Sequence, residues 1–294
     1  MAAMIGGGAN RLGQGIEAIQ GAAAAAPVPA RDRKSRIRFV WWIVFLAGVV
    51  YFIVPLIATL LFSLREEPFG AAYLAILSDG QFLSSLAYSF VVGVLTIIFS
   101  ILLIVPTAFW VRLRLPRARP FVEFITLLPF VVPPIVLVFG LIQTYSHPPL
   151  PFTYSDIGSS ALLVAGYVIL SFPYMYRAVD TGLRTMDIQS LTEASQSLGA
   201  GWGRILLQVI LPNLRVALLA GAFLTLAIVV GEFTMALFLA RPAFAPYLFG
   251  LGSNHPYQQA AVALISFGLT WIAMGFIAVL GRGSRSRITV TGAR

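Results

Sequence analysis

Few side chains of this sequence have the types and spacing that catalytic chemistry requires. The 294 residues include no cysteine, which excludes disulfides and thiol catalysis, and the two histidines, His147 and His255, lie too far apart in the sequence to suggest a zinc site. The one lysine, Lys34, follows no glycine-rich loop, so the chain has no Walker nucleotide site. The HExxH and GxSxG motifs and paired aspartates are also absent. The sequence therefore predicts neither an enzyme nor a protein that holds a metal or cofactor.

The longest polar connection, residues 177–215, has a pattern typical of a recognition helix. Asp187 can cap a helix over Ile188–Leu198, because its side chain can accept hydrogen bonds from the free amides of the first turn. Gly199 can end that helix in the left-handed conformation, and a second helix is expected over Trp202–Leu211. Small residues at the centre of the first helix favour docking into a groove of a partner protein. The alternative is a helix that lies on lipid headgroups.

A single acidic side chain, Glu232, falls within a long apolar stretch. A carboxylate at membrane depth is costly and indicates a functional site by default, so Glu232 is predicted to line or gate a transport path. The alternative is a structural glutamate that is protonated or bonded to a neighbouring helix. Further polar contacts along the path are expected from Thr234, Tyr88 and Ser89.

The elements that carry these groups are predicted to be transmembrane helices. Hydrophobic residues make up 59% of the chain and charged residues 11%, with a mean hydropathy of +0.88, and one soluble core of this length cannot hide so much apolar surface. A helix needs about 20 apolar residues to cross the bilayer core, and the six qualifying stretches are too long and too uniformly apolar for barrel strands. They are Phe39–Leu64, Phe82–Val111, Phe121–Tyr145, Ala161–Tyr176, Val216–Ala240 and Gln259–Gly281.

The basic residues predict the orientation of these spans. Of the 20 Lys and Arg residues, 18 fall on one side and two, Arg65 and Arg241, on the other. Positive charge concentrates in cytoplasmic loops, so both termini are predicted to be cytoplasmic, and the basic balance indicates no nucleic-acid partner. The chain divides into a flexible arm (1–38), a membrane domain (39–281) and a cytoplasmic tail (282–294). The first apolar stretch is too long for the core of a signal peptide and is expected to remain a span.

Prolines interrupt several of the spans, and the adjacent Pro133 and Pro134 disrupt the most. Each proline removes a helix hydrogen bond and kinks the chain, and neighbouring helices or water can satisfy the freed carbonyls. The pair is predicted to be a hinge in a moving helix; the alternative is an ordinary kink.

The polar connection resembles a motif of one transporter family. It contains Glu193-Ala194-Ser195, three residues, Gly199, nine residues, Val209, one residue and Leu211-Pro212. This pattern resembles the EAA loop of inner-membrane permeases of binding-protein-dependent (type I) ABC importers, with Ser195 and Val209 as mild departures. The resemblance implies an all-α, multi-pass permease of the bacterial cytoplasmic membrane with six spans. Its loop helix would dock in a cleft of an ATPase and pass the motion of the ATPase to the spans. The coupling residues that the resemblance implies are Glu193, Ala194, Ser195, Leu198, Gly199 and Ala200.

The same resemblance implies partners and a substrate class. The partners are a second permease, identical or homologous, a cytoplasmic ATPase dimer that binds ATP and Mg²⁺, and an extracytoplasmic binding protein. A second similarity lies in the segment with Gly231-Glu232-Phe233 followed by Leu237-Phe238-Leu239. This segment resembles the corresponding sequence in permeases of the polyamine, opine, phosphonate and iron(III) group. A carboxylate in the path favours a polyamine; phosphonate, iron(III) or another small solute are alternatives. A carrier driven by an ion gradient through Glu232 is a further alternative, disfavoured because the sequence shows no inverted repeat.

Overall fold

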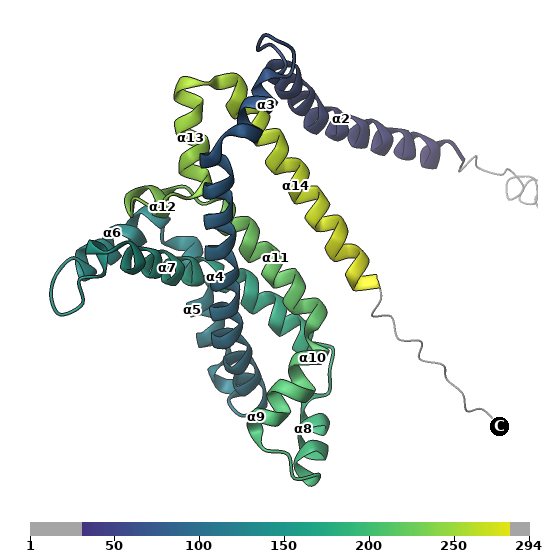
Figure 1. Ribbon diagram of the computed structural model, residues 1–294. Helices are drawn as coiled ribbons and strands as arrows, with labels where there is room; N and C mark the ends of the chain where they lie inside the picture. The colour runs from purple at the N-terminus through teal and green to yellow at the C-terminus, as the bar shows by residue number, and fades with distance from the viewer. Residues whose placement is uncertain (1–30, 283–294) are drawn as a thin grey trace, which may run out of the picture. The chain divides into compact units, whose positions relative to one another are not determined.

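The computed structural model describes the backbone of residues 31–282 and most side chains between residues 40 and 272 (Figure 1). Every regular element in this part of the chain is a helix, as the sequence predicts. Most of the predicted arm and tail, residues 1–30 and 283–294, lies outside the described residues. The chain forms two units, divided after Ile57, and each is described by itself.

The described part of the first unit belongs to helix α2 (Arg31–Ser63), whose last turns lie in the second unit. The stretch Val40–Ser63 has a mean hydropathy of 2.6 and is long enough to cross a membrane. It matches the predicted span Phe39–Leu64, but the helix begins earlier, at Arg31, within the segment predicted as a flexible arm.

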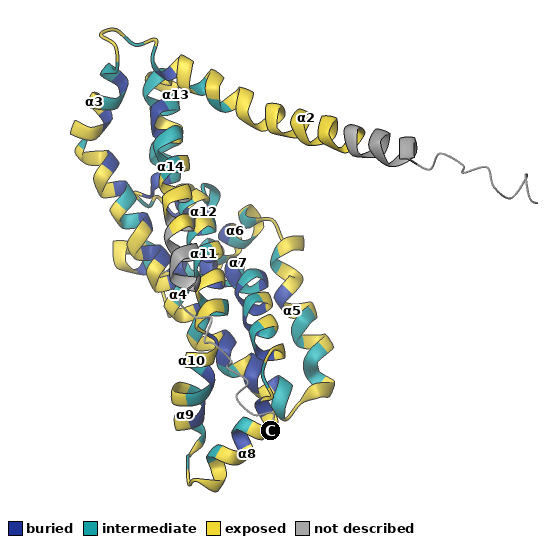
Figure 2. Cartoon of the chain, turned by 90° about the vertical axis from the view of Figure 1, so that its right-hand side faces the viewer, coloured by how far each residue is buried: buried dark blue, intermediate teal, exposed yellow. Residues whose placement is uncertain are grey.

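Two long helices and one shorter helix form the centre of the second unit. They are α4 (Gly80–Leu113), α7 (Asp156–Arg184) and α11 (Arg215–Gly231). Residues buried on the facing sides of these helices make up most of the core, whereas many exposed side chains on their outer sides are apolar (Figure 2). Helix α7 is longer at both ends than the predicted span Ala161–Tyr176, because the helical residues continue through polar positions that a hydropathy criterion leaves out.

Glycines allow the central helices to approach closely. A Cβ atom on Gly93 of α4 would lie 2.5 Å from Cδ1 of Leu226 on α11, and one on Gly221 would lie 2.8 Å from Sδ of Met175 on α7. Small residues at such crossings bring helix backbones together, which is how helices pack in a membrane.

The third predicted span, Phe121–Tyr145, is not one helix. It is divided into α5 (Arg119–Val131) and α6 (Pro134–Tyr145), whose axes differ by 96°. Val132 and Pro133 between them are extended, because the residue before a proline avoids the helical conformation and a proline donates no helix hydrogen bond. The predicted disruption at Pro133-Pro134 is thus confirmed, while its role as a moving hinge stays a prediction.

The fifth predicted span, Val216–Ala240, is also wrong beyond Gly231. Helix α11 ends there, Glu232 is extended, and the short helix α12 (Thr234–Phe238) follows. The carboxylate of Glu232 binds the first amides of α12, so a new helix starts where a straight span was expected. Upstream, the segment Trp202–Asn213 meets α11 at 77°.

The remaining helices complete the second unit. Helices α3 (Ala71–Ser78) and α13 (Phe244–Asn254) were not predicted, and α14 (Pro256–Arg282) contains the sixth predicted span, Gln259–Gly281. Among the described residues, three helices are long and apolar enough to cross a membrane, or up to five segments if each bent pair counts as one. The count of six spans and the cytoplasmic location of both termini stay predictions.

Candidate functional site

The predicted recognition helix is present as α8 (Ile188–Ser197). The Ser190 amide donates to Oδ1 of Asp187 over 3.1 Å, and the Ser190 hydroxyl donates to Oδ2 over 2.6 Å. These two hydrogen bonds lower the pKa of the Asp187 carboxyl below its ordinary value, because they stabilise the ionised form. Gly199 follows the helix with φ of +79°, in the left-handed region that glycine adopts without strain. The predicted cap and stop are both confirmed.

Helix α8 presents most of the predicted coupling residues on its free side. Ile188 and Thr192, one turn apart, are buried against the chain, while Glu193 and Ala194 are exposed and Leu198 is 89% exposed. Glu193 accepts a hydrogen bond of 3.0 Å from the Gln189 amide. Of the other predicted members, Gly199 is exposed, and Ser195 and Ala200 are half-buried.

The segment after α8 is helical, as predicted, but it differs in its winding. It consists of α9 (Trp202–Arg204), a π-helical stretch η3 (Ile205–Ile210) and α10 (Leu211–Asn213), so the predicted Trp202–Leu211 helix continues through Pro212. Ile205 and Ile210 are fully buried. The stretch thus links α8 directly to α11.

An aromatic contact that the sequence did not reveal joins this segment to α4. The ring of Trp202 lies 4.8 Å from that of Trp110 between centroids, and the Arg114 guanidinium lies 5.3 Å from the Trp202 ring centroid. Aromatic stacking and cation–π attraction both act over such distances. The segment Trp202–Asn213 is therefore packed against the end of α4.

A cluster of charges joins the ends of α4, α5 and α7 on the same side. The Asp180 carboxylate, whose side chain is 14% exposed, lies 3.3 Å from Nη1 of Arg112, 3.3 Å from Nη2 of Arg119 and 2.7 Å from Nη2 of Arg184. Arg119 also pairs with Glu123 at 2.8 Å. Sequence reasoning missed Asp180; the four-residue spacing to Arg184 on one helix was the available signal.

Glu232 is held by hydrogen bonds rather than left free. Its Oε1 accepts from the Thr234 amide and its Oε2 from the Met235 amide, each over 2.9 Å, and the Tyr167 hydroxyl of α7 donates to Oε2 over 3.1 Å. The carboxylate thus caps α12 and ties it to α7. These contacts correspond to the structural alternative, and a role in a path or gate stays a prediction.

Of the other residues predicted for the path, Thr234 bonds to Glu232, whereas Tyr88 and Ser89 bond to other groups. Tyr88 shares a hydrogen bond of 2.8 Å with Ser160, and the buried Ser89 accepts from the Phe244 amide over 2.8 Å. Thr234 meets Glu232 through its backbone amide. The four predicted residues therefore do not form one site.

A groove at the meeting of α5, α7 and α11 contains a positive charge. It has a volume of about 770 Å³, and Arg177 of α7 lies on it with an exposed side chain. No ion pair involves this guanidinium among the described residues. The polar residues that accompany it on the groove wall are Tyr174, Thr181, Thr185 and Asn213.

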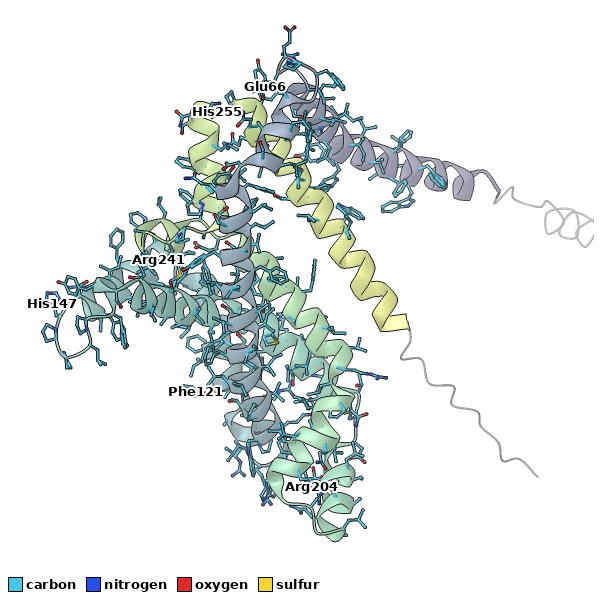
Figure 3. The ribbon with its side chains drawn as sticks, viewed as in Figure 1. Glu66, Phe121, His147, Arg204, Arg241 and His255 are labelled. Carbon is cyan, nitrogen blue, oxygen red and sulfur yellow. The ribbon has the colours of Figure 1, made fainter. Side chains whose placement is uncertain are left out.

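In the part of the chain that the structure describes, no group of three or more His, Asp or Glu side chains could hold a metal ion. His147 and His255 lie on different connections, well separated in the view of Figure 3.

Residues 100–286 match the model of one protein family, described as the binding-protein-dependent transport system inner membrane component. A probable molybdenum ABC transporter permease of Haloferax volcanii is 28% identical over 80% of this chain and 88% of its own length. A probable ABC transporter permease of Sinorhizobium fredii is 28% identical over 74% of this chain, which spans only 38% of that relative. A putative ferric transport permease of Haemophilus influenzae is 32% identical over 49% of this chain and 22% of its own length.

Two solved structures resemble the fold. A bacterial ABC transporter that imports the acidic polysaccharide alginate aligns with a TM-score of 0.66 and 13% identity, covering 86% of this chain and 99% of its own. The alginate transporter in complex with its pentasaccharide-bound periplasmic protein aligns with a TM-score of 0.64 and 14% identity, covering 89% and 99%.

Proposed function

Since the chain belongs to the family of binding-protein-dependent transport system inner membrane components, and is thus an inner-membrane permease of a type I ABC importer, we propose a role in transport. We propose that it forms half of the pathway of an ATP-driven importer. A second permease, identical or homologous, supplies the other half. A cytoplasmic ATPase dimer binds ATP and Mg²⁺, and an extracytoplasmic binding protein delivers the solute. The alginate transporter with its periplasmic protein supports this kind of assembly.

The observation that carries the proposal is the free side of α8. The helix is capped by Asp187 and anchored by Ile188 and Thr192, so its exposed Glu193 and Leu198 are held in a fixed position. An acidic group can accept charge-assisted hydrogen bonds from an arginine of the ATPase, and Leu198 can fill an apolar pocket beside it. The ATPase supplies the nucleotide site that this sequence lacks.

A paired variant tests the coupling role. Glu193→Arg combined with Gly199→Pro reverses the charge on α8 and removes the left-handed turn that ends it. ATP-driven uptake by the reconstituted importer should be lost, while the amount of permease in the membrane stays unchanged. Glu67→Arg, which reverses an exposed charge outside the polar connection, is the matched control and should transport normally. Normal uptake by the double variant would overturn the proposal.

For the substrate, we favour a small oxyanion of the molybdate type over a polyamine. The polyamine prediction depended in part on Glu232 as a carboxylate in the path, but three donors already bind this group. The exposed charge in the groove of α5, α7 and α11 is instead the positive Arg177, with hydroxyl and amide groups beside it. Such a set suits an anion, since a guanidinium binds oxyanions by charge-assisted hydrogen bonds. Relatives named for molybdenum support this choice.

Competition between substrates distinguishes the alternatives. In vesicles that contain the whole importer, uptake of radioactive molybdate should proceed and should be unaffected by excess spermidine or ferric ion. Arg177→Gln should lower molybdate uptake, whereas Arg117→Gln, at an exposed arginine between α4 and α5 that lies outside this groove, should not. Uptake of spermidine, or of ferric ion, without molybdate uptake would contradict the oxyanion proposal while leaving the importer class intact.

No specific observation favours a carrier driven by an ion gradient. That alternative needs Glu232 to exchange protons or cations during transport, and the contacts of this side chain describe a helix cap instead.

A further inference from the structure

A large groove between α4 and α7 is not used by the proposed function. Its volume is about 1120 Å³. Four apolar residues of α4 follow one another along it at intervals of four, and all are substantially exposed: Val91, Leu95, Phe99 and Leu103. Positions at this spacing share one side of a helix, so α4 turns a continuous apolar stripe toward the groove.

The facing wall on α7 is shaped by small residues. Ile157, Ala161, Ala165 and Ile169 also recur at intervals of four along the groove. The two central positions are alanines, so the wall recedes where a larger side chain would fill the space. At 1.5 Å per residue, the groove extends over about 22 Å along α4 between Tyr88 and Leu103. Half the thickness of the hydrocarbon core of a bilayer is about 15 Å, so the groove is longer than that.

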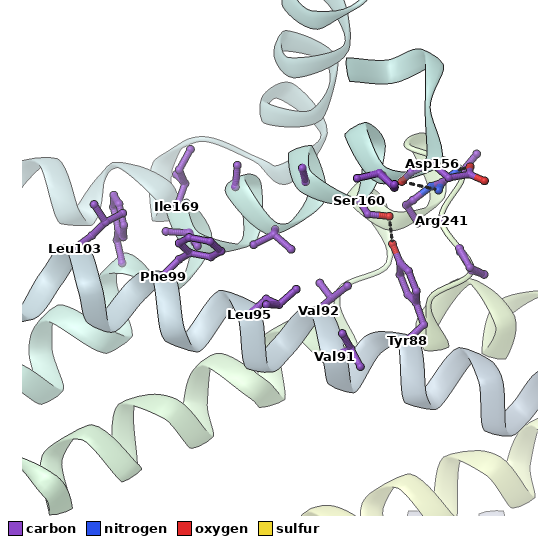
Figure 4. A pocket seen from close by; sticks show the side chains of 18 residues that line it. Tyr88, Val91, Val92, Leu95, Phe99, Leu103, Asp156, Ser160, Ile169 and Arg241 are labelled. Carbon is purple, nitrogen blue, oxygen red and sulfur yellow. Dashed lines mark hydrogen bonds and ion pairs between the residues drawn. The ribbon is translucent and has the colours of Figure 1, made fainter. Parts of the chain in front are cut away.

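One end of the groove is polar and the other apolar. Figure 4 shows Tyr88, Ser160, Asp156 and Arg241 together at one end, and Phe99, Leu103 and Ile169 toward the other. Nothing polar interrupts the apolar part. A lining of this kind does not suit an inorganic ion, which would lose its hydration there, but it matches a molecule with a charged head and a hydrocarbon tail.

The charged pair at the polar end is built into the chain. The Arg241 side chain is only 12% exposed, and its Nε donates to the Leu239 carbonyl over 3.1 Å. Nη1 donates to the carbonyl of Asp156 over 3.1 Å, and Nη2 donates to Oδ1 of Asp156 over 2.6 Å. A guanidinium has five N–H donors, so two remain for a ligand. The Asp156 side chain is 90% exposed and can accept from a cation.

We propose that this groove binds one zwitterionic phospholipid, with an acyl chain along α4 and α7 and the headgroup at Arg241 and Asp156. The phosphate receives the free guanidinium donors, and the headgroup ammonium lies against the Asp156 carboxylate, so both charges of the lipid meet an opposite charge. An anionic lipid would gain the first contact and meet repulsion from the second. The arginine count places this end of the groove on the extracytoplasmic side.

Native mass spectrometry tests the proposal on the complete importer. The complex is released from vesicles of equal phosphatidylethanolamine and phosphatidylglycerol, and retained lipid is measured per permease chain. The wild type should retain phosphatidylethanolamine. Ala165→Trp, which fills the groove, should lose it. Ala75→Trp, at an exposed position of α3 outside the groove, is the matched control and should retain it.

Arg241→Gln provides a second variant if the tryptophan variant fails to assemble. Loss of the guanidinium should lower phosphatidylethanolamine retention about tenfold, as expected for one charge-assisted contact. Equal retention of the two lipids by the wild type would overturn the proposal, and so would equal retention by Ala165→Trp and Ala75→Trp. A crosslink from a cysteine at Leu95 to a helix of a second permease would also overturn it, because the groove would then be a protein interface.

Discussion

Replacing Asp180 by asparagine should destabilise the contact between the ends of α4, α5 and α7. The Asp180 carboxylate is the shared partner of Arg112, Arg119 and Arg184, which come from α4, α5 and α7. Asparagine keeps the shape and one acceptor oxygen of the side chain but removes its charge. Three guanidiniums then face one another with only Glu123 left to offset them.

The expected cost follows from burial. Removing one member of a fully buried ion pair costs about 3–5 kcal/mol, and an exposed pair contributes about 0–1 kcal/mol. The Asp180 side chain is 14% exposed, but its partners are 30%, 36% and 53% exposed, so solvent screens part of the repulsion. We expect a loss of about 1–3 kcal/mol, which at about 2–4 °C per kcal/mol for a large domain lowers the melting temperature by about 2–12 °C.

Thermal unfolding of the purified importer, at one detergent and salt concentration, measures this effect. Glu123→Gln is the matched control, because Glu123 and Arg119 are 42% and 36% exposed and their four-residue pair lies on one helix. The control should shift the melting temperature by about 1–2 °C or less. Added salt should reduce the difference between the two variants. Equal melting temperatures for both variants would refute the reasoning that Asp180 joins the helix ends.

Two further predictions concern packing and the helix cap. Gly221→Leu should destabilise the permease by about 1–3 kcal/mol, because a Cβ there would lie 2.8 Å from Sδ of Met175; Gly140→Leu, where nothing lies within 4 Å, is the thermal-melt control. The hydrogen bonds of Asp187 lower the pKa of its carboxyl. The ionised carboxylate therefore stabilises α8 fully at any pH above the ordinary pKa of 3.8, and this stabilisation is lost only as the pH falls through the lowered pKa. A carboxyl NMR titration should therefore give a midpoint below 3.8, and a midpoint above 3.8 would contradict the cap.

Local features of this chain could be predicted from its sequence. The cap at Asp187, the stop at Gly199 and the break at Pro133 each depend on one residue type and its immediate neighbours, and the structure has all three. Glycine and proline restrict the backbone wherever they occur. Helix α8 could accordingly be placed to within one residue.

Contacts between distant parts of the sequence could not be predicted in the same way. Hydropathy counts Glu232 as a charge inside a span, because nothing near it in sequence reveals that Tyr167 of another helix and the amides of α12 bind it. The contact between the tilted rings of Trp202 and Trp110 likewise depends on the folded arrangement of helices. Such pairs follow from tertiary packing, which periodicity does not encode.

The most direct test of the account is uptake by vesicles that contain the permease with and without its ATPase. The account predicts solute accumulation that requires ATP, the ATPase and an intact Glu193–Gly199 segment together. Rapid accumulation by the permease alone, in the absence of ATP, would contradict it.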